Sequence, residues 1–267
     1  MRKIYNEQNT AYKAANLFFK QCGILTGPTA VGKTDLLIKL SKSLNAEIIS
    51  ADSMQIYKYM DIGSAKITKE EMDNVVHHMI DEVTPDVPFS VSEFQTRSEK
   101  YINDIHERRK RVLVTGGTGL YLNSLIYNMD FAKSDANNEI REKLEKELEE
   151  NGIDYMHEKL RSLDEDAANR IHKNNTKRVI RAIEVCLSGN KMNDFSKDLR
   201  YNEKYKPIII VLNRDREVLY QRINKRVDIM LENGLLDEVK KLLEMGYTKD
   251  MISMQGIGYK EMIKYLD

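Results

Sequence analysis

The sequence predicts an α/β fold in which a parallel β-sheet is flanked by helices and interrupted by a helical insertion. Three observations support this fold class. Short apolar runs alternate with longer amphipathic stretches along most of the chain. The runs are rich in Val and Ile without polar alternation, which is typical of strands covered on both faces. A Gly-rich, phosphate-binding sequence connects the first run to the first amphipathic stretch.

Five apolar runs are strand candidates, and four stretches have helical periodicity. The predicted strands are 23–26, 47–51, 78–81, 112–115 and 207–212. The predicted helices are 36–44, 91–109, 120–127 and 218–245, and Gly234 is expected to break the last one. In that helix Leu219, Ile223, Val227, Met230 and Leu231 fall on one face, as in an amphipathic helix.

The stretch 131–200 differs in composition from the rest of the chain. It is polar, charged and helical, and the segment 139–150 alone carries six acidic and three basic residues. Because it contains no strand candidate, we predict a helical insertion domain between two sheet strands. The α/β core would then comprise residues 21–130 and 201–267. Residues 1–20 are expected to form an N-terminal arm outside the fold.

Charge and hydrophobic composition limit how the protein could bind nucleic acids or membranes. The 42 basic and 42 acidic residues cancel, so a nucleic-acid surface must be a local patch. The longest apolar runs are too short to span a bilayer. The apolar cluster at 14–19 is flanked by lysines and lacks a signal-peptide core. We therefore expect a cytoplasmic protein with no membrane partner, acting as a monomer.

The sequence Gly-Pro-Thr-Ala-Val-Gly-Lys-Thr at 27–34 matches the GxxxxGK[ST] phosphate-binding loop. It follows a predicted strand and precedes a predicted helix, the context that a P-loop requires. Backbone N–H groups and the helix N-terminus would bind phosphate, Lys33 would reach its outer oxygens, and Thr34 is placed to ligate Mg²⁺. The predicted phosphate contacts are Gly27, Pro28, Thr29, Ala30, Val31, Gly32, Lys33 and Thr34. The motif specifies a P-loop, nucleoside-kinase-like fold but leaves kinases, NTPases and GTPases open.

Two further polar segments follow predicted strands. Asp52 comes directly after the second strand, at the sheet edge where α/β proteins bind ligands. The segment Thr115-Gly-Gly-Thr-Gly-Leu-Tyr121 follows the fourth strand and offers the Thr118 hydroxyl. Asp52 could equally support a Mg²⁺ ion, and Thr118 could cap the following helix. His77 and His78 lack a third ligand at metal spacing and are more simply structural.

Taken together, these motifs resemble one family, the tRNA dimethylallyltransferases, also called tRNA isopentenyltransferases. The resemblance rests on GPTAVGKT at 27–34, SADSMQIYKYMDIGSAK at 50–66, HHMIDEVTP at 77–85, VTGGTGLYLNSL at 114–125, AANRIHKNNTKRVIRAIEV at 167–185, RINKRVDIMLENGLLDEVKKLLEMGY at 222–247 and QGIGYKEM at 255–262. It covers the chain from about residue 22 to the last residue. The joint occurrence of the motifs in this order is highly specific.

The resemblance implies that the P-loop binds the diphosphate of dimethylallyl diphosphate rather than ATP. The allyl group would pass to N6 of the adenosine immediately 3′ of the anticodon, in tRNAs reading codons that begin with U. It implies that Asp52 is the general base, with Lys33, Thr34 and Thr118 completing the catalytic set and Mg²⁺ as cofactor. The target adenine would leave the anticodon-loop stack to react.

The resemblance also implies contacts with the anticodon stem-loop of tRNA. The matching positions are Asp52, Ser53, Met54, Gln55, Thr118, Arg141, Lys177, Arg178, Val179, Ile180, Arg181, Gln255, Gly256, Ile257, Gly258, Tyr259 and Lys260. The stretch 170–181 carries five basic residues and no acidic one, which suits phosphate contact. Local helix packing is the alternative interpretation for Tyr259 and Lys260.

The sequence also departs from the family pattern. Members continue beyond the GYKEM region into a basic helix, a segment that these 267 residues do not contain, so we expect a truncated form. Three other functions stay open. These are prenyl transfer to free AMP or ADP, a small-molecule kinase whose Arg-rich lid would use Arg222 and Arg226, and a non-catalytic RNA-binding module.

Overall fold

The computed structural model describes residues 22–129, 131, 138–190, 199–205 and 207–267. The predicted N-terminal arm, 1–20, lies outside these ranges. The chain divides into two compact units, Met1–Asn128 with Tyr201–Asp267, and Met129–Arg200. No helix in the described ranges is long and apolar enough to cross a membrane.

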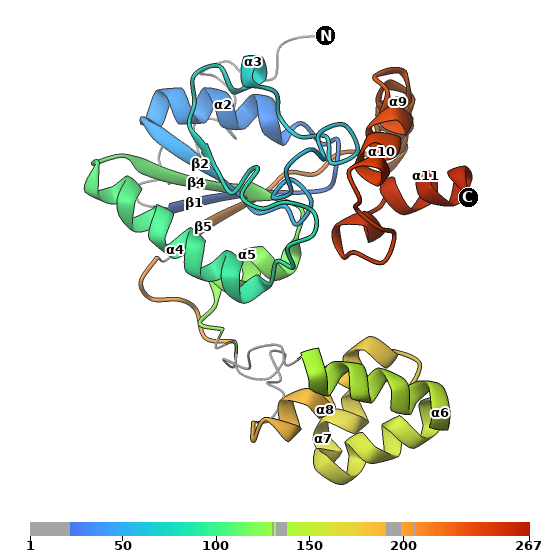
Figure 1. Cartoon of the computed structure of the whole chain (residues 1–267). Coiled ribbons are helices and arrows are strands. Elements are labelled where there is room, and N and C mark those ends of the chain that lie inside the picture. The colour runs from blue at the N-terminus through green and yellow to red at the C-terminus, as the bar shows by residue number, and fades with distance from the viewer. Residues whose placement is uncertain (1–21, 130, 132–137, 191–198, 206) are drawn as a thin grey trace. The chain divides into compact units, whose positions relative to one another are not determined.

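The first unit is built on a five-stranded, all-parallel sheet (Figure 1). Its strands are β1 (Cys22–Thr26), β2 (Ala46–Ser50), β3 (His77–His78), β4 (Arg111–Gly116) and β5 (Ile208–Val211), in the order β3-β2-β4-β1-β5. All five predicted strands are present. The third was predicted to run to residue 81. It ends at His78 because Met79 and Asp81 have φ of 62° and 56°, outside the extended region.

Helices cover both faces of this sheet, as the continuous apolar character of the strands predicts. Helix α2 (Lys33–Leu44) lies on one face, and α4 (Val91–Glu107) and α5 (Gly119–Ile126) lie on the other (Figure 1). Helix α3 (Lys69–Met72) is a single turn. Helix α4 begins at a capping box in which Ser90 and Glu93 satisfy each other's backbone N–H groups.

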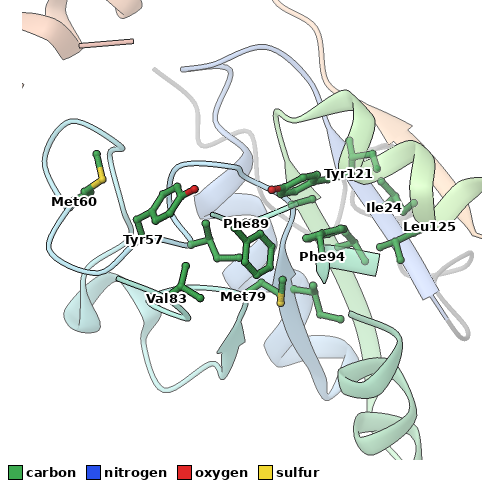
Figure 2. Packing of buried hydrophobic residues seen from close by; sticks show 14 of the residues in the cluster. Ile24, Tyr57, Met60, Met79, Val83, Phe89, Phe94, Tyr121 and Leu125 are labelled. Atoms are coloured by element: carbon green, nitrogen blue, oxygen red, sulfur yellow. The ribbon is translucent and has the colours of Figure 1, made fainter. Parts of the chain in front are cut away.

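The two faces have separate hydrophobic cores. On one side Leu25 and Ile48 pack with Leu37 and Leu40 of α2. On the other side the neighbouring strand residues Ile24 and Ile49 join a larger cluster with aromatic side chains from α4 and α5 (Figure 2). Because successive strand residues point to opposite faces, each central strand contributes to both cores.

The C-terminal part of this unit is helical. It contains α9 (Arg216–Glu232), α10 (Leu235–Glu244), the 3₁₀ turn η1 (Ser253–Gln255) and α11 (Tyr259–Leu266). The predicted break at Gly234 is confirmed, since this residue has φ of 94° and precedes α10. Helix α10 buries Leu235, Val239 and Leu242. None of the α9 residues, all of which the structure describes, is buried.

The second unit is helical over the part that the structure describes. It contains α6 (Asn138–Leu163), α7 (Glu165–Arg170) and α8 (Thr176–Leu187), and no strand lies within 138–190. Gly152, with φ of 80° and ψ of 177°, divides α6 into two helices. Leu144, Met156 and Leu160 of α6 pack with residues of α7 and α8 in a core of their own.

Candidate active site

The P-loop follows β1 and leads directly into α2. Gly27 has φ of 145°, and a Cβ at this position would lie 2.4 Å from the carbonyl oxygen of Leu212, so only glycine is accommodated. Gly32 occupies the N-cap position of α2, so the helix N-terminus opens onto the loop. Lys33 Nζ donates to the carbonyl oxygens of Gly27 and Pro28, at 2.9 and 3.0 Å. The loop, the helix N-terminus and the Lys33 ammonium group therefore lie together, the arrangement that a bound phosphate would need.

Arginines from the end of the chain also contact this loop. Arg222 Nε donates to the Ala30 carbonyl at 2.7 Å, and an Arg214 guanidinium nitrogen donates to Val31 O at 3.3 Å. Burial, then the charge of Arg226, lower the pKa of Lys33, while Asp52 acts in the opposite direction. The sequence singled out Arg222 only as part of a kinase lid and gave no signal for Arg214.

Asp52 begins a tight turn at the carboxyl end of β2. Its Oδ1 accepts hydrogen bonds from the backbone N–H groups of Met54 and Gln55, at 2.9 and 3.3 Å. The side chain is half-buried. Burial lowers the pKa of Arg226, and the negative charge of Asp52 acts to raise it. Because Asp52 influences both Lys33 and Arg226, the carboxylate and the P-loop cations share one electrostatic environment.

Thr118 connects the loop after β4 to this turn. The Ser53 backbone N–H donates to Thr118 Oγ1 at 2.9 Å, and the Thr118 hydroxyl lies 3.2 Å from Ser53 Oγ. Thr118 is the N-cap residue of α5, but its side chain makes no capping hydrogen bond. The hydroxyl therefore does not cap the helix. It holds Ser53, the residue next to Asp52.

Aromatic side chains lie beside the turn. Phe94 and Tyr121 are stacked, with ring centroids 4.2 Å apart and planes 14° from parallel. The hydroxyl ends of Tyr57 and Tyr121 point toward each other (Figure 2). Burial raises the pKa of Tyr121, and the charges of Tyr57, Glu93 and Asp52 raise it further. The site thus combines a cationic loop and one carboxylate with a neighbouring aromatic wall that is buried and largely apolar.

Gln55 holds the long loop that follows Asp52. Ser50 Oγ donates to Gln55 Oε1 at 3.0 Å, and Gln55 Nε2 donates to the carbonyls of Ser64 and Ala65 at 3.4 and 3.3 Å. Both ends of the amide are therefore used within the protein. Gln55, which is also predicted to contact tRNA, organises the loop through its side chain.

The segment 255–260, also predicted to contact tRNA, divides into packed and exposed residues. Tyr259 is fully buried and donates its hydroxyl to Glu238 Oε1 at 2.6 Å. Gly256 lies against Met54, since a Cβ there would come within 2.3 Å of the Met54 methyl carbon. For Tyr259 the alternative of local packing is correct. The exposed side chains are those of Gln255, Ile257 and Lys260.

In the helical unit, two of the arginines predicted to contact tRNA form ion pairs with a buried glutamate. Arg141 and Arg181 each place a guanidinium nitrogen 2.9 Å from Glu184 Oε2, and Glu184 is fully buried. Burial alone would raise the pKa of Glu184, but hydrogen bonds from Arg181 and Arg141 outweigh it and hold the pKa below its ordinary value. These arginines therefore stabilise the unit's interior.

The remaining predicted residues of α8 also separate by burial. Val179 and Ile180 are 1% and 6% exposed and belong to the unit's hydrophobic core, so their side chains cannot reach RNA. Lys177 and Arg178, in the first turn of the helix, are exposed. Because the helix buries the residues that follow, only its N-terminal turn offers cations to a partner.

His77 and His78 are structural, as their spacing predicts. His77 Nδ1 lies 2.9 Å from the Val75 carbonyl oxygen. His78 Nε2 lies 2.7 Å from Glu47 Oε2, and Glu47, only 1% exposed, also pairs with Arg108 and Lys110. Across the described residues, no group of three or more His, Cys, Asp or Glu side chains is placed to hold a metal ion.

Comparison with known proteins decides the family. The model of the IPP transferase family matches residues 55–267, more than half of the chain. A tRNA dimethylallyltransferase of Clostridioides difficile (strain 630) is 78% identical over 244 residues, which cover 91% of this chain and 78% of that protein. The chain belongs to the IPP transferase family.

Other relatives of the chain agree. A tRNA dimethylallyltransferase of Alkaliphilus oremlandii is 56% identical over 93% of the chain and 80% of its own length. The crystal structure of a Bacillus halodurans tRNA isopentenylpyrophosphate transferase has a TM-score of 0.66 and 45% identity, covering 93% of this chain and 78% of that one. A eukaryotic dimethylallyltransferase acting on tRNA has a TM-score of 0.78 at 31% identity, covering 92% and 63%. The P-loop, kinase-like fold prediction is confirmed.

Sequence reasoning also missed a residue that contacts the loop between β2 and α3, which follows Asp52. Glu238 of α10 accepts hydrogen bonds from three consecutive backbone N–H groups of that loop, at 61–63. In sequence it is one acid in an amphipathic helix, and neither its type nor its spacing distinguishes it from its neighbours. The only available signal was the match of the whole segment 222–247 to the family.

Proposed function

We propose that this protein transfers a dimethylallyl group from dimethylallyl diphosphate to N6 of the adenosine immediately 3′ of the anticodon, releasing diphosphate. The acceptors are tRNAs that read codons beginning with U, and the activity is that of a tRNA dimethylallyltransferase (EC 2.5.1.75). One observation carries the proposal. The P-loop after β1 and Asp52 after β2 share one edge of the sheet and one electrostatic environment, in a chain up to 78% identical to proteins of that name.

The P-loop is assigned to the diphosphate of the donor. Its backbone N–H groups, the α2 N-terminus and Lys33 supply positive charge where negative charge grows as the carbon–oxygen bond breaks. Arg222, which already contacts the Ala30 carbonyl, adds a cation on the same side. Diphosphate would then leave as a well-stabilised anion, as an allylic displacement requires.

A Mg²⁺ ion is compatible with the donor chemistry at the loop. Thr34, the predicted ligand, is exposed in the first turn of α2 and carries a hydroxyl oxygen, a ligand type that Mg²⁺ accepts. The described residues form no dedicated metal cluster, which fits an ion that takes its other ligands from diphosphate and water. Bound there, Mg²⁺ would neutralise charge on the departing diphosphate.

Asp52 is assigned to the acceptor. The exocyclic amine of adenine is a weak nucleophile and must lose a proton as it attacks carbon, so a carboxylate beside the donor is the required general base. The turn bonds that Asp52 Oδ1 receives from Met54 and Gln55 fix the side chain. Thr118 holds Ser53 and so keeps the carboxylate at the sheet edge.

The aromatic wall suits the allyl group. The stacked pair Phe94–Tyr121 is buried, so we expect it to act electrostatically, near a site whose substrate develops positive charge on carbon, rather than by direct contact. Aromatic faces attract such charge, and the apolar surroundings exclude water that would otherwise capture the carbon. We assign the acceptor's backbone to exposed cations, among them Lys177, Arg178 and Lys260.

The test is a direct assay. The protein is incubated with dimethylallyl diphosphate, Mg²⁺ and either tRNA or AMP, and the nucleosides are analysed by mass spectrometry. Dimethylallyl-adenosine should form in tRNA and not from AMP. A product from AMP alone would favour adenylate prenylation, and phosphate transfer from ATP to a small acceptor would favour a kinase. Cytoplasmic fractionation and light scattering test the further expectation of a monomer in the cytoplasm.

A further inference from the structure

Glu238 of α10 binds the loop between β2 and α3 through three successive amides. Its Oε2 accepts from the backbone N–H groups of Asp61 and Ile62, at 2.9 and 2.8 Å. Its Oε1 accepts from the N–H of Gly63 at 3.1 Å and from the hydroxyl of Tyr259 at 2.6 Å. One carboxylate thus joins α10, the first residue of α11 and an irregular loop.

Close packing reinforces these hydrogen bonds. The Tyr259 ring lies over Gly63, where a Cβ would come within 2.6 Å of ring carbons. Burial first, then the hydrogen bond to Glu238, raise the pKa of Tyr259, so its hydroxyl stays protonated and donates. The neighbouring contact between Gly256 and Met54 brings the same C-terminal segment onto the turn that follows Asp52.

Hydrogen bonds, joined by short covalent stretches of the chain, lead from Glu238 to Asp52. Immediately after the three amides come Ser64 and Ala65, whose carbonyl oxygens accept from Gln55 Nε2. The Gln55 backbone N–H in turn donates to Asp52 Oδ1. The loop has little regular secondary structure between β2 and α3, so its shape depends on such side-chain contacts.

We propose that Glu238 is a positioning residue for the reaction. By holding the amides at 61–63 it sets the loop that places Asp52 against the acceptor, and it makes α10 and α11 part of the active-site framework. The inference rests on the proposed function for its catalytic consequence. Misplacing a catalytic group by 1 Å can lower the reaction rate about 10²-fold, so loosening this loop should slow the chemical step.

The decisive comparison uses Glu238→Gln and Tyr259→Phe, with Glu244→Gln as matched control. The Gln variant keeps one acceptor oxygen but replaces the other by an NH₂ group that faces backbone N–H donors. Tyr259→Phe removes one donor and keeps the ring over Gly63. Glu244 is an exposed carboxylate on the same helix.

For Glu238→Gln we expect kcat with tRNA, counted per donor-binding site, to fall at least about tenfold. The affinity for dimethylallyl diphosphate, measured by calorimetry, should stay within about twofold, because the P-loop contacts are untouched. The kcat of Tyr259→Phe should fall less than that of Glu238→Gln, and the kcat of Glu244→Gln should match that of the wild type. Unchanged kcat per binding site in Glu238→Gln, or equal losses of donor affinity and kcat, would overturn the positioning role.

Hydrogen exchange separates this inference from the proposed function. Glu238→Gln should speed exchange at the amides of residues 61–63 and also at Met54 and Gln55, the two amides bound by Asp52. The second effect is not expected of a purely local anchor. If wild-type protein fails to prenylate tRNA, the proposed function is wrong, and exchange at Met54 and Gln55 still decides whether Glu238 controls the turn. Unchanged exchange there refutes the inference.

Discussion

Thr118 and Ser53 hold each other across the sheet edge: the Ser53 N–H donates to Thr118 Oγ1 at 2.9 Å, and the Thr118 hydroxyl donates to Ser53 Oγ at 3.2 Å. The two residues follow different strands, β4 and β2, which are neighbours in the sheet. The pair therefore ties two loops together one residue away from Asp52, and its loss should act on that carboxylate.

Replacing Thr118 by Val tests this link with little change in volume. One hydrogen bond contributes roughly 1 kcal/mol, so we expect kcat to fall about fivefold while donor affinity stays within about twofold. Thr118→Ser retains the hydroxyl and should keep most of the activity. Steady-state kinetics with tRNA measure both variants, and an equal loss in the Ser variant would show that the methyl group, not the hydroxyl, matters.

Asp52→Asn should separate donor binding from chemistry. Losing a general base lowers the rate about 10²–10⁴-fold, whereas the amide keeps an oxygen for the turn. Donor affinity should be nearly unchanged. Lys33→Ala should instead weaken binding of dimethylallyl diphosphate as well as kcat. Single-turnover rates and calorimetry give the two quantities, with Asp250→Asn, an exposed acid, as control. Wild-type turnover in Asp52→Asn would assign the proton to another group.

The sequence was a reliable guide where a signal is local. The strand, Gly-rich loop and helix around Lys33 are contiguous, so their arrangement follows from the motif and the apolar pattern. Asp52 is found in the same way, as the polar residue that ends a buried strand. The buried side chain of Tyr259 was not foreseen, because a motif match shows that a position matters and not which way its side chain points.

The residues that the sequence did not reveal act across long separations. Glu238 bonds amides about 175 positions away in the chain, from residue 238 to residue 63. Arg141 of α6 pairs with Glu184 of α8, 43 positions away, and nothing in the local charge pattern shows that this glutamate is buried. For Glu238 and for Arg141, the partner is brought near by tertiary packing, which no periodicity in a single segment encodes. Arg181 lies three residues from Glu184 on the same helix, so there the sequence concealed the burial of the partner and not its proximity.

The exposed first turn of α8 should contribute to the salt dependence of tRNA binding. Each single-strand phosphate contact contributes a slope of roughly −0.7 in log K against log salt, so Lys177→Ala with Arg178→Ala should flatten the slope by about 1.4. Donor affinity should not change, because these residues lie outside the P-loop unit. Filter binding at several salt concentrations measures the slope. An unaltered slope would move the tRNA surface elsewhere.

Arg181 should behave differently from Arg178, although the two are three residues apart. Arg181→Ala leaves the buried Glu184 with one fewer partner, and breaking a buried ion pair costs about 3–5 kcal/mol. Arg178→Ala removes an exposed cation and should change stability by less than about 0.5 kcal/mol. Chemical denaturation followed by circular dichroism measures both. Equal stability of the two variants would contradict the buried pairing.

Glu47 should make stability depend on pH in acid. Burial would raise its pKa, but hydrogen bonds from Arg108, His78 and Lys110 lower it from 4.5 to about 2. A carboxyl group whose pKa is lower in the folded state than in the unfolded state stabilises the fold at pH values above the unfolded-state pKa. This stabilisation is lost as the pH falls from about 4.5 toward 2. Glu47→Gln should therefore cost about 3 kcal/mol at pH 7 and progressively less at pH 4 and 3.

The control for this pH series is Glu107→Gln, an exposed acid at the end of α4. Its free energy of unfolding, measured in urea at each pH, should track the wild type throughout. If the free energies of unfolding of the wild type and Glu47→Gln differed by the same amount across this pH range, the partners of Glu47 would not be lowering its pKa in the folded state.

The chain leaves the sheet unit and returns to it at one point. Tyr127 and Tyr201 form an antiparallel bridge, their rings lie 5.2 Å apart, and the Asn202 N–H donates to the Ile126 carbonyl at 2.8 Å. Bridged residues have Cα atoms only about 5 Å apart, a gap that a two-residue turn spans. A gene lacking codons 129–199 would thus encode a sheet domain whose chain runs on through a two-residue turn, so the sheet unit can be expressed and studied without the helical unit.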